Sequence, residues 1–276
     1  MTSSDPWTTW QLGEWRRFRR SRERGLAAPY GWLSLTALHW LDADPAPVPG
    51  FPGLWSGADG TITATFTAED GVARHGEPIT GTVIVEFTDD GSDDSFFHAG
   101  VVGEAGIRGG RPMLRLRDPK APTRTSFTGV PTYDWDPAWV LPARFHPTDG
   151  EEIVTVASAQ PQVRVPVRVS GKVTFVLGEE DLVLTVTGDG RGSVAFHDPT
   201  NGDATADWRF CPLGEIDPEG GTTLDFNRSL NFPSAFSPYG TCPRPLPENV
   251  VPIPVTAGER RPRSPRDDGA TRPPLG

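Results

Sequence analysis

The sequence predicts a mainly β protein: an antiparallel two-sheet sandwich or distorted barrel, with an N-terminal amphipathic helix and a long ordered proline-rich loop. The 31 glycines and 30 prolines, together with abundant Thr and Val, favour strands joined by tight turns. Short strand-like segments recur at regular spacing, as in sandwiches and barrels. A chain of 276 residues can bury a sizeable core without support from disulfides or metal ions. We predict a helix over 1–24, a single β-rich domain over 25–259 and a disordered tail over 260–276.

The first element is the helix, with Asp5 as its N-cap and Pro6 at its first position. Aromatic side chains follow at roughly helical spacing: Trp7, Trp10, Trp15 and Phe18. Arginines crowd the opposite side: Arg16, Arg17, Arg19, Arg20, Arg22 and Arg24. A basic amphipathic helix of this kind can lie on an anionic membrane surface. We favour the alternative, in which the aromatic face caps the β structure and the arginines are solvated.

The apolar spacing of residues 31–41 fits a buried helix or a strand equally well. Beyond this segment we predict strands over 61–67, 82–87, 96–101, 113–117, 139–145, 153–156, 163–169, 173–177, 182–186, 194–197, 222–226 and 251–255. Turn signals between hairpin strands stand at 69–71, 89–91, 168–171 and 188–190. This succession of short strands and turn signals favours a sandwich or barrel over the parallel sheet of an α/β protein.

The segment 222–259 is too rich in proline to be a helix. It also contains apolar area that a disordered segment would not need, from Phe226, Leu230, Phe232, Phe236 and Tyr239. Long connections without regular structure are uncommon in compact domains, and ordered ones are usually functional. We therefore expect this loop to fold over the strand ends and to close a shared polar chamber.

The formal net charge of −10 argues against nucleic-acid binding, which depends on phosphate neutralisation. Among the basic residues only Lys120 and Lys172 are lysines, and this excess of arginine is typical of a GC-rich bacterial genome such as an actinomycete's. The N-terminus has no signal-peptide core and no apolar run could span a bilayer, so we expect a cytoplasmic protein with no membrane partner. In that reducing compartment Cys211 and Cys242 should be free thiols.

Motifs for common cofactors and catalytic machineries are missing. The sequence contains no GxGxxG after a strand, no GxxxxGK[ST], no HExxH and no GxSxG. Its histidines are scattered, and metal binding would need several of them to converge: His39, His75, His98, His146 and His197. We therefore expect neither a cofactor nor a metal.

Candidate site residues gather around the ends of predicted strands and in the loop. As catalytic candidates we select His197, Asp198, Asp225, Tyr239 and Cys242, and as substrate-binding candidates Arg117, Arg124, Arg209, Asn227 and Arg228. An aspartate could act as general base if burial raised its pKa, with Tyr239 or His197 as acid. Cys242 could be a nucleophile if Arg228 or Arg244 stabilised its thiolate. The alternative is structural: ion pairs that pin the loop, and a cysteine that fills an apolar gap.

Several blocks of the sequence resemble the bacterial family catalogued as domain of unknown function 1684. These blocks are Gly31-Trp-Leu-Ser-Leu, Arg117-Asp-Pro, Phe196-His-Asp-Pro-Thr-Asn-Gly202, Leu224-Asp-Phe-Asn-Arg228, Thr241-Cys-Pro243, Glu248-Asn249 and Ala257-Gly-Glu259. The resemblance spans about 15–259, and it implies no established reaction. The chain looks like a divergent member, because relatives tend to carry other residues at His197, Ala206, Ser234 and Arg260.

Three hypotheses follow. The first is a cofactor-independent enzyme, of the hydrolase, lyase or isomerase type, that acts on an anionic small molecule with acid/base residues of the loop 222–249. The alternative is a non-catalytic β protein that binds a small molecule in a pocket lined by some of its nine tryptophans. The third is an interaction module in which residues 7–24 dock a partner or a second copy, so that a homodimer stays open.

Overall fold

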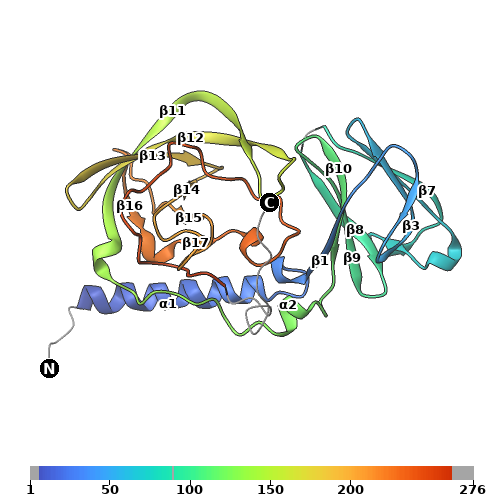
Figure 1. The fold of residues 1–276 in the computed structure, drawn as a ribbon, viewed down its shortest axis with the longest axis horizontal. Helices are drawn as coiled ribbons and strands as arrows, with labels where there is room; N and C mark the ends of the chain where they lie inside the picture. Colours follow the sequence, from blue (N-terminus) through green and yellow to red (C-terminus); the bar gives the residue numbers. More distant parts are fainter. Residues whose placement is uncertain (1–5, 89, 263–276) are drawn as a thin grey trace.

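The computed structural model describes residues 6–88 and 90–262, and it confirms a mainly β chain. The described strands form three antiparallel sheets, where the sequence predicts a two-sheet sandwich or a barrel (Figure 1). The predicted N-cap Asp5, the turn residue Asp89 and residues 263–276 of the predicted tail lie outside this described part. Its α-helices are α1 at Pro6–Leu26 and α2 at Pro122–Thr125. No helix among the described residues is long and apolar enough to cross a bilayer.

Two sheets from the N-terminal half of the chain pack face to face, on the right of Figure 1. The six-stranded sheet has the order β1-β10-β9-β8-β5-β6, with bounds Leu35–Trp40, Arg111–Arg117, Val101–Arg108, Ser92–His98, Ala73–Arg74 and Glu77–Pro78. The four-stranded sheet has the order β2-β3-β4-β7, with bounds Ala46–Val48, Phe51–Ala58, Thr61–Phe66 and Gly81–Glu86. The ring of Trp55 meets those of Phe66 and Phe96 edge to face at 5.6 and 5.2 Å. Because Phe96 belongs to the first sheet and Trp55 to the second, this core confirms the sandwich.

The third sheet arches over the left side of the molecule in Figure 1. Its order is β16-β11-β12-β13-β14-β15-β17, with bounds Gly221–Asp225, Val140–Ala157, Arg164–Leu177, Glu180–Thr187, Ser193–Phe196, Arg209–Pro212 and Leu230–Asn231. Its core combines strand residues such as Phe196 and Leu224 with Val251, Val255 and Ala257 of the C-terminal segment. That segment therefore completes the core, although it forms no strand of its own.

The helix α1 covers the open side of this sheet, as Figure 1 shows. The indole Nε1 of Trp15 donates to the backbone carbonyl of Asn227 over 2.9 Å. Trp7 and Trp10 stack on each other at 5.1 Å and stay about half exposed, so only part of the aromatic face caps the fold. The expectation that all the arginines are solvated is wrong for Arg19, which is buried.

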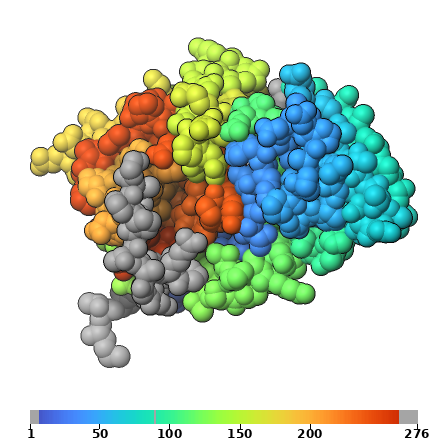
Figure 2. All heavy atoms as spheres, turned by 45° about the vertical axis from the view of Figure 1, so that its right-hand side comes forward, coloured from blue at the N-terminus to red at the C-terminus, as the bar shows by residue number. Residues whose placement is uncertain are grey.

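The proline-rich loop is ordered and lies between the two-sheet sandwich and the third sheet. Its orange spheres touch both the blue and the yellow-green spheres in Figure 2. It contains two short 3-10 helices, η4 at Phe226–Arg228 and η5 at Pro233–Ala235. Phe236 packs with a cluster around Leu33, and Leu246 packs with a cluster around Val163. Apolar side chains of the loop thus fill the space between the two-sheet sandwich and the third sheet.

Three further 3-10 helices stand in connections: η1 at Trp32–Ser34, η2 at Ala68–Asp70 and η3 at Pro137–Trp139. The ambiguous segment 31–41 becomes η1 followed by β1.

The sequence misplaced three features of the strands. The predicted turn 168–171 is a bulge inside the long strand β12, whose pairing with β13 shifts between Val169 and Gly171. A Cβ at Gly171 would collide with the carbonyl of His146, so this close approach requires glycine. The predicted strand 96–101 spans the turn between β8 and β9, and 251–255 is irregular chain.

Candidate functional site

Asp198 and Arg209 form an ion pair whose side chains have no exposed area, with Oδ1 and Nη2 3.1 Å apart. Asp198 follows β14 and also accepts hydrogen bonds at Oδ2 from the backbone nitrogens of Thr200, at 3.1 Å, and Val255, at 2.9 Å. Arg209 begins β15 and donates to the carbonyls of Val255, Ala257 and Glu259. Burial lowers the pKa of Arg209, an effect that the neighbouring Asp198 opposes. The pair therefore ties the C-terminal segment to the third sheet.

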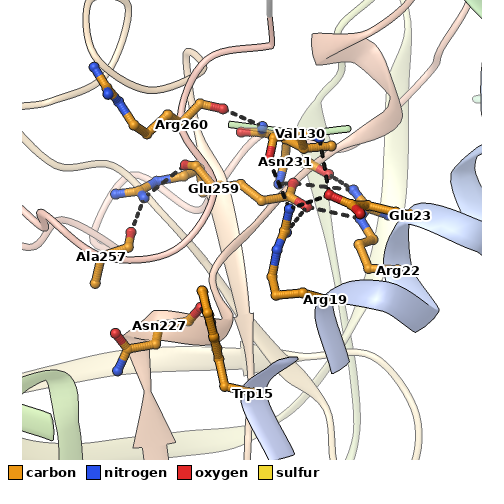
Figure 3. A network of polar contacts seen from close by, with 11 residues as sticks. Trp15, Arg19, Arg22, Glu23, Val130, Asn227, Asn231, Ala257, Glu259 and Arg260 are labelled. Atoms are coloured by element: carbon orange, nitrogen blue, oxygen red, sulfur yellow. Dashed lines mark hydrogen bonds and ion pairs between the residues drawn. The ribbon is translucent and has the colours of Figure 1, made fainter. Parts of the chain in front are cut away.

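Glu259 extends this anchoring to α1, as Figure 3 shows. Its side chain has no exposed area and accepts a hydrogen bond of 2.7 Å from Arg19 Nη1 and one of 3.2 Å from Arg22 Nε. It also accepts from the backbone nitrogen of Asn231 over 2.7 Å. We call Asp198, Arg209, Glu259, Arg19 and Arg22 the C-terminal clasp. Its function is to hold residues 255–259 between α1 and the third sheet.

Asp225, Asn227 and Arg228 make a second local group at the end of β16. Asp225 caps η4 by accepting from the backbone nitrogen of Asn227 over 3.0 Å, and its Oδ2 lies 3.2 Å from Arg228 Nε. Burial raises the pKa of Asp225, against the lowering effect of the Asn227 and Arg228 contacts. Asn227 exchanges hydrogen bonds with the backbone of Asp136 on the neighbouring connection. Asn227, which also donates to Asp225, thus connects the loop to Asp136 at the start of η3.

Within residues 6–88 and 90–262, no carboxylate or base is hydrogen-bonded to the side chain of His197, Tyr239 or Cys242. His197 is half-buried, and its Nδ1 lies 3.2 Å from the backbone carbonyl of Asp207. The only hydrogen bond described for Tyr239 joins its backbone nitrogen to Ser237. Burial raises the pKa of the Cys242 thiol, and likewise that of the Cys211 thiol, so both free cysteines are neutral near pH 7.

Arg117 belongs to a different cluster, in the six-stranded sheet. The carboxylate of Glu104 accepts hydrogen bonds from three guanidinium groups. The donors are Arg117 Nη2 at 2.8 Å, Arg115 Nη2 at 2.5 Å and Arg108 Nη2 at 3.2 Å. Burial alone would raise the pKa of Glu104, but the hydrogen bonds and charges of Arg115 and Arg117 lower it to about 2. Trp32 lies against both of those guanidinium groups.

Arg124 is engaged elsewhere, because its Nε donates to the carbonyl of Ala27 over 2.9 Å and its Nη1 to that of Pro119 over 2.7 Å.

The structure therefore distributes the selected residues over separate groups instead of one chamber. Asp198 and Arg209 lie in the clasp, Asp225 and Arg228 pair locally, and Arg117 lies with Glu104. None of the selected residues lines either of the two hollows described next. The expected convergence of loop carboxylates and arginines on one cavity is not what the geometry shows.

The first hollow, of about 220 Å³, opens beside β12, β13 and β14. Its walls include Val167, Thr187, Ala195, Phe232 and Leu246, and we call it the apolar hollow. The second, of about 210 Å³, is lined by Ala159, Asp207, Trp208, Ser234 and Arg261 among others, and we call it the polar hollow.

Arg244 lines both hollows and so marks the place where they adjoin. Its Nε donates to the carbonyl of Ser158 over 3.3 Å, and its guanidinium lies 4.7 Å from the centre of the Trp208 ring. No carboxylate pairs with it anywhere in residues 6–88 and 90–262. A fixed guanidinium of this kind offers two donors to an anion.

In the sequence, Arg244 is a candidate only as a cation near Cys242, and Trp208 and Arg261 are not candidates. The usable signal was weak: three prolines flank Arg244 at positions 243, 245 and 247, which stiffen the chain on both sides of it. For metals, the described residues contain no group of three or more His, Cys, Asp or Glu that could hold an ion.

Part of the chain matches the sequence model of a known family. Residues 125–260 match the model of the family described as "Protein of unknown function (DUF1684)". The chain thus carries a region of this family, as its blocks predicted, and the match includes neither of the two blocks before residue 125. No curated protein is similar enough to count as a match.

A solution NMR structure of an uncharacterized protein from Haloarcula marismortui is similar at 27% identity and a TM-score of 0.42, covering 50% of this chain and 78% of that one.

Proposed function

We propose that this protein binds a small anionic molecule at Arg244 and does not transform it. The observation that carries the proposal is the state of the Arg244 guanidinium. It is fixed by the Ser158 carbonyl and the Trp208 ring, it borders two hollows, and it has no carboxylate partner among the described residues. An arginine without an anionic partner, held at the wall of a cavity, is suited to recognise a carboxylate or phosphate group.

The catalytic alternative has less support from the geometry. An acid/base pair must reach a common substrate atom. Asp198 pairs with Arg209 and accepts from the backbone nitrogen of Val255, both Nη atoms of Arg209 are bonded, and Asp225 is used as a cap. A neutral, buried Cys242 is a poor nucleophile. A binding protein requires none of these groups to react.

A fluorescence titration tests the proposal, because the Arg244 guanidinium contacts the Trp208 indole. Sodium hexanoate and sodium phosphate are added to the wild type, to Arg244→Met and to the control Arg191→Met at constant ionic strength. Arg191 is exposed and lines neither hollow. We expect a saturable signal in the wild type and in Arg191→Met, and at least tenfold weaker binding in Arg244→Met. Equal binding by Arg244→Met and the wild type would contradict the proposal.

We further propose a cytoplasmic bacterial protein, in keeping with the absence of a membrane-spanning helix among the described residues. Cell fractionation checks the compartment.

A further inference from the structure

The two hollows differ in chemistry and adjoin at Arg244. Val167, Ala195, Phe232 and Leu246 give the first an apolar wall. Asp207, Ser234 and Arg261 give the second a polar one. A ligand held by Arg244 can therefore place an ionic group in the polar hollow and a hydrocarbon part in the apolar hollow. This reasoning rests on the proposed function and asks which anion fits.

The charges around the polar hollow favour a monoanion. Arg244 and Arg261 line it, and the described part of the chain provides neither with a carboxylate partner. Asp207 also lines it and contributes one negative charge. The formal sum of these three side chains is +1, which a single carboxylate neutralises and a phosphate dianion exceeds. Arg168, at the apolar hollow, is already paired with Glu151 and Asp189 and adds no free charge.

The apolar hollow favours a hydrocarbon tail. Its volume of about 220 Å³ exceeds what one water molecule occupies, and most of its walls offer no hydrogen-bond partners. Water in such a space is replaced favourably by apolar atoms. We infer that the ligand is an aliphatic monocarboxylic acid, whose carboxylate binds Arg244 in the polar hollow and whose hydrocarbon chain fills the apolar hollow.

A chain-length series tests this inference on the full-length protein. Acetate, butyrate, hexanoate and octanoate are titrated at equal ionic strength, with inorganic phosphate as the probe for a simple anion site. We expect affinity to rise about threefold to fourfold per methylene until the hollow is full. Phosphate should bind more weakly than hexanoate.

A blocking variant and a matched control identify the hollow that is responsible. Val167→Phe fills the apolar hollow, whereas Val176→Phe adds the same ring on an exposed position of the same strand. Val167→Phe should keep acetate binding and lose the rise with chain length, and Val176→Phe should behave like the wild type. If Val167→Phe does not fold, Ser193→Leu blocks the hollow from β14.

The possible failures are distinguishable. Equal affinity for all four acids in the wild type, or tighter binding of phosphate than of hexanoate, overturns the inference but leaves anion binding at Arg244 standing. A chain-length effect that survives in both blocking variants also overturns it, because the tail then lies elsewhere. If no acid or phosphate saturates the wild type, the inference and the proposed function fail together.

Discussion

Replacing Glu259 by Gln removes one negative charge from the centre of the C-terminal clasp. The carboxylate has no exposed area. It accepts hydrogen bonds from Arg19 Nη1 at 2.7 Å, Arg22 Nε at 3.2 Å and the backbone nitrogen of Asn231 at 2.7 Å. Glutamine keeps one acceptor and turns an NH₂ group toward a guanidinium, so the buried Arg19 keeps only the partly exposed Glu23, at 3.2 Å, as a counter-charge. Breaking a buried pair in this way costs about 3–5 kcal/mol. This is a large part of the about 5–15 kcal/mol that stabilises a folded domain.

Urea unfolding, followed by circular dichroism and by tryptophan fluorescence, measures the effect. The control is Glu14→Gln, which breaks a pair between Glu14 and Arg17 on the same helix, where both side chains are partly exposed. The control should change the unfolding free energy by less than about 1 kcal/mol. A loss below about 1 kcal/mol in Glu259→Gln would refute the claim that the clasp holds the C-terminal segment.

Three further predictions concern ionisable groups. The pKa of Glu104 is lowered from 4.5 to about 2 in the folded state, so the unfolded chain binds more protons between these values and stability falls as the pH drops below about 5. This contribution is about 3 kcal/mol, and it should be missing from the pH profile of Glu104→Gln unfolding. Asp225→Asn, which removes a carboxylate whose pKa burial raises but keeps a capping oxygen, should unfold within about 1 kcal/mol of the wild type. Cys211 and Cys242, with pKa values raised by burial, should react with a thiol reagent at least tenfold faster in denaturant than in the native state.

The fold class could be predicted because many of its strands and turns have a recognisable pattern within a few neighbouring residues. The strand predicted over 61–67 is β4, and the turn at 188–190 connects β13 to β14 as a hairpin. The strand β9 was missed because Gly103, Ala105 and Gly106 remove the usual alternation, and consecutive residues are buried on both faces. The segment 251–255 has the apolar alternation of a strand, yet Asp198 and Arg209 bind the backbone groups of Val255.

The candidate site was harder to predict because its partners are distant in the sequence. Arg19 and Glu259 are 240 residues apart, and nothing in the sequence near Glu259 reveals that α1 neutralises it. Asp198 and Arg209 are site candidates because a carboxylate and a guanidinium can act on a substrate. In the folded chain they instead bind backbone groups of the C-terminal segment. Arg244 stands out only once the structure shows which arginines lack a carboxylate partner.

The indole N–H signals of the tryptophans in an NMR titration test the location of the anion site most directly. Trp208 lies against Arg244, Trp15 is bonded to Asn227 beside the Asp225 group, and Trp32 lies against the Glu104 cluster. With assignments from Trp→Phe variants, hexanoate should move the Trp208 signal saturably in the wild type and not in Arg244→Met. The Trp15 and Trp32 signals should stay in place. A saturable shift of Trp15 with Trp208 unmoved would contradict the account and place the ligand at the loop carboxylates.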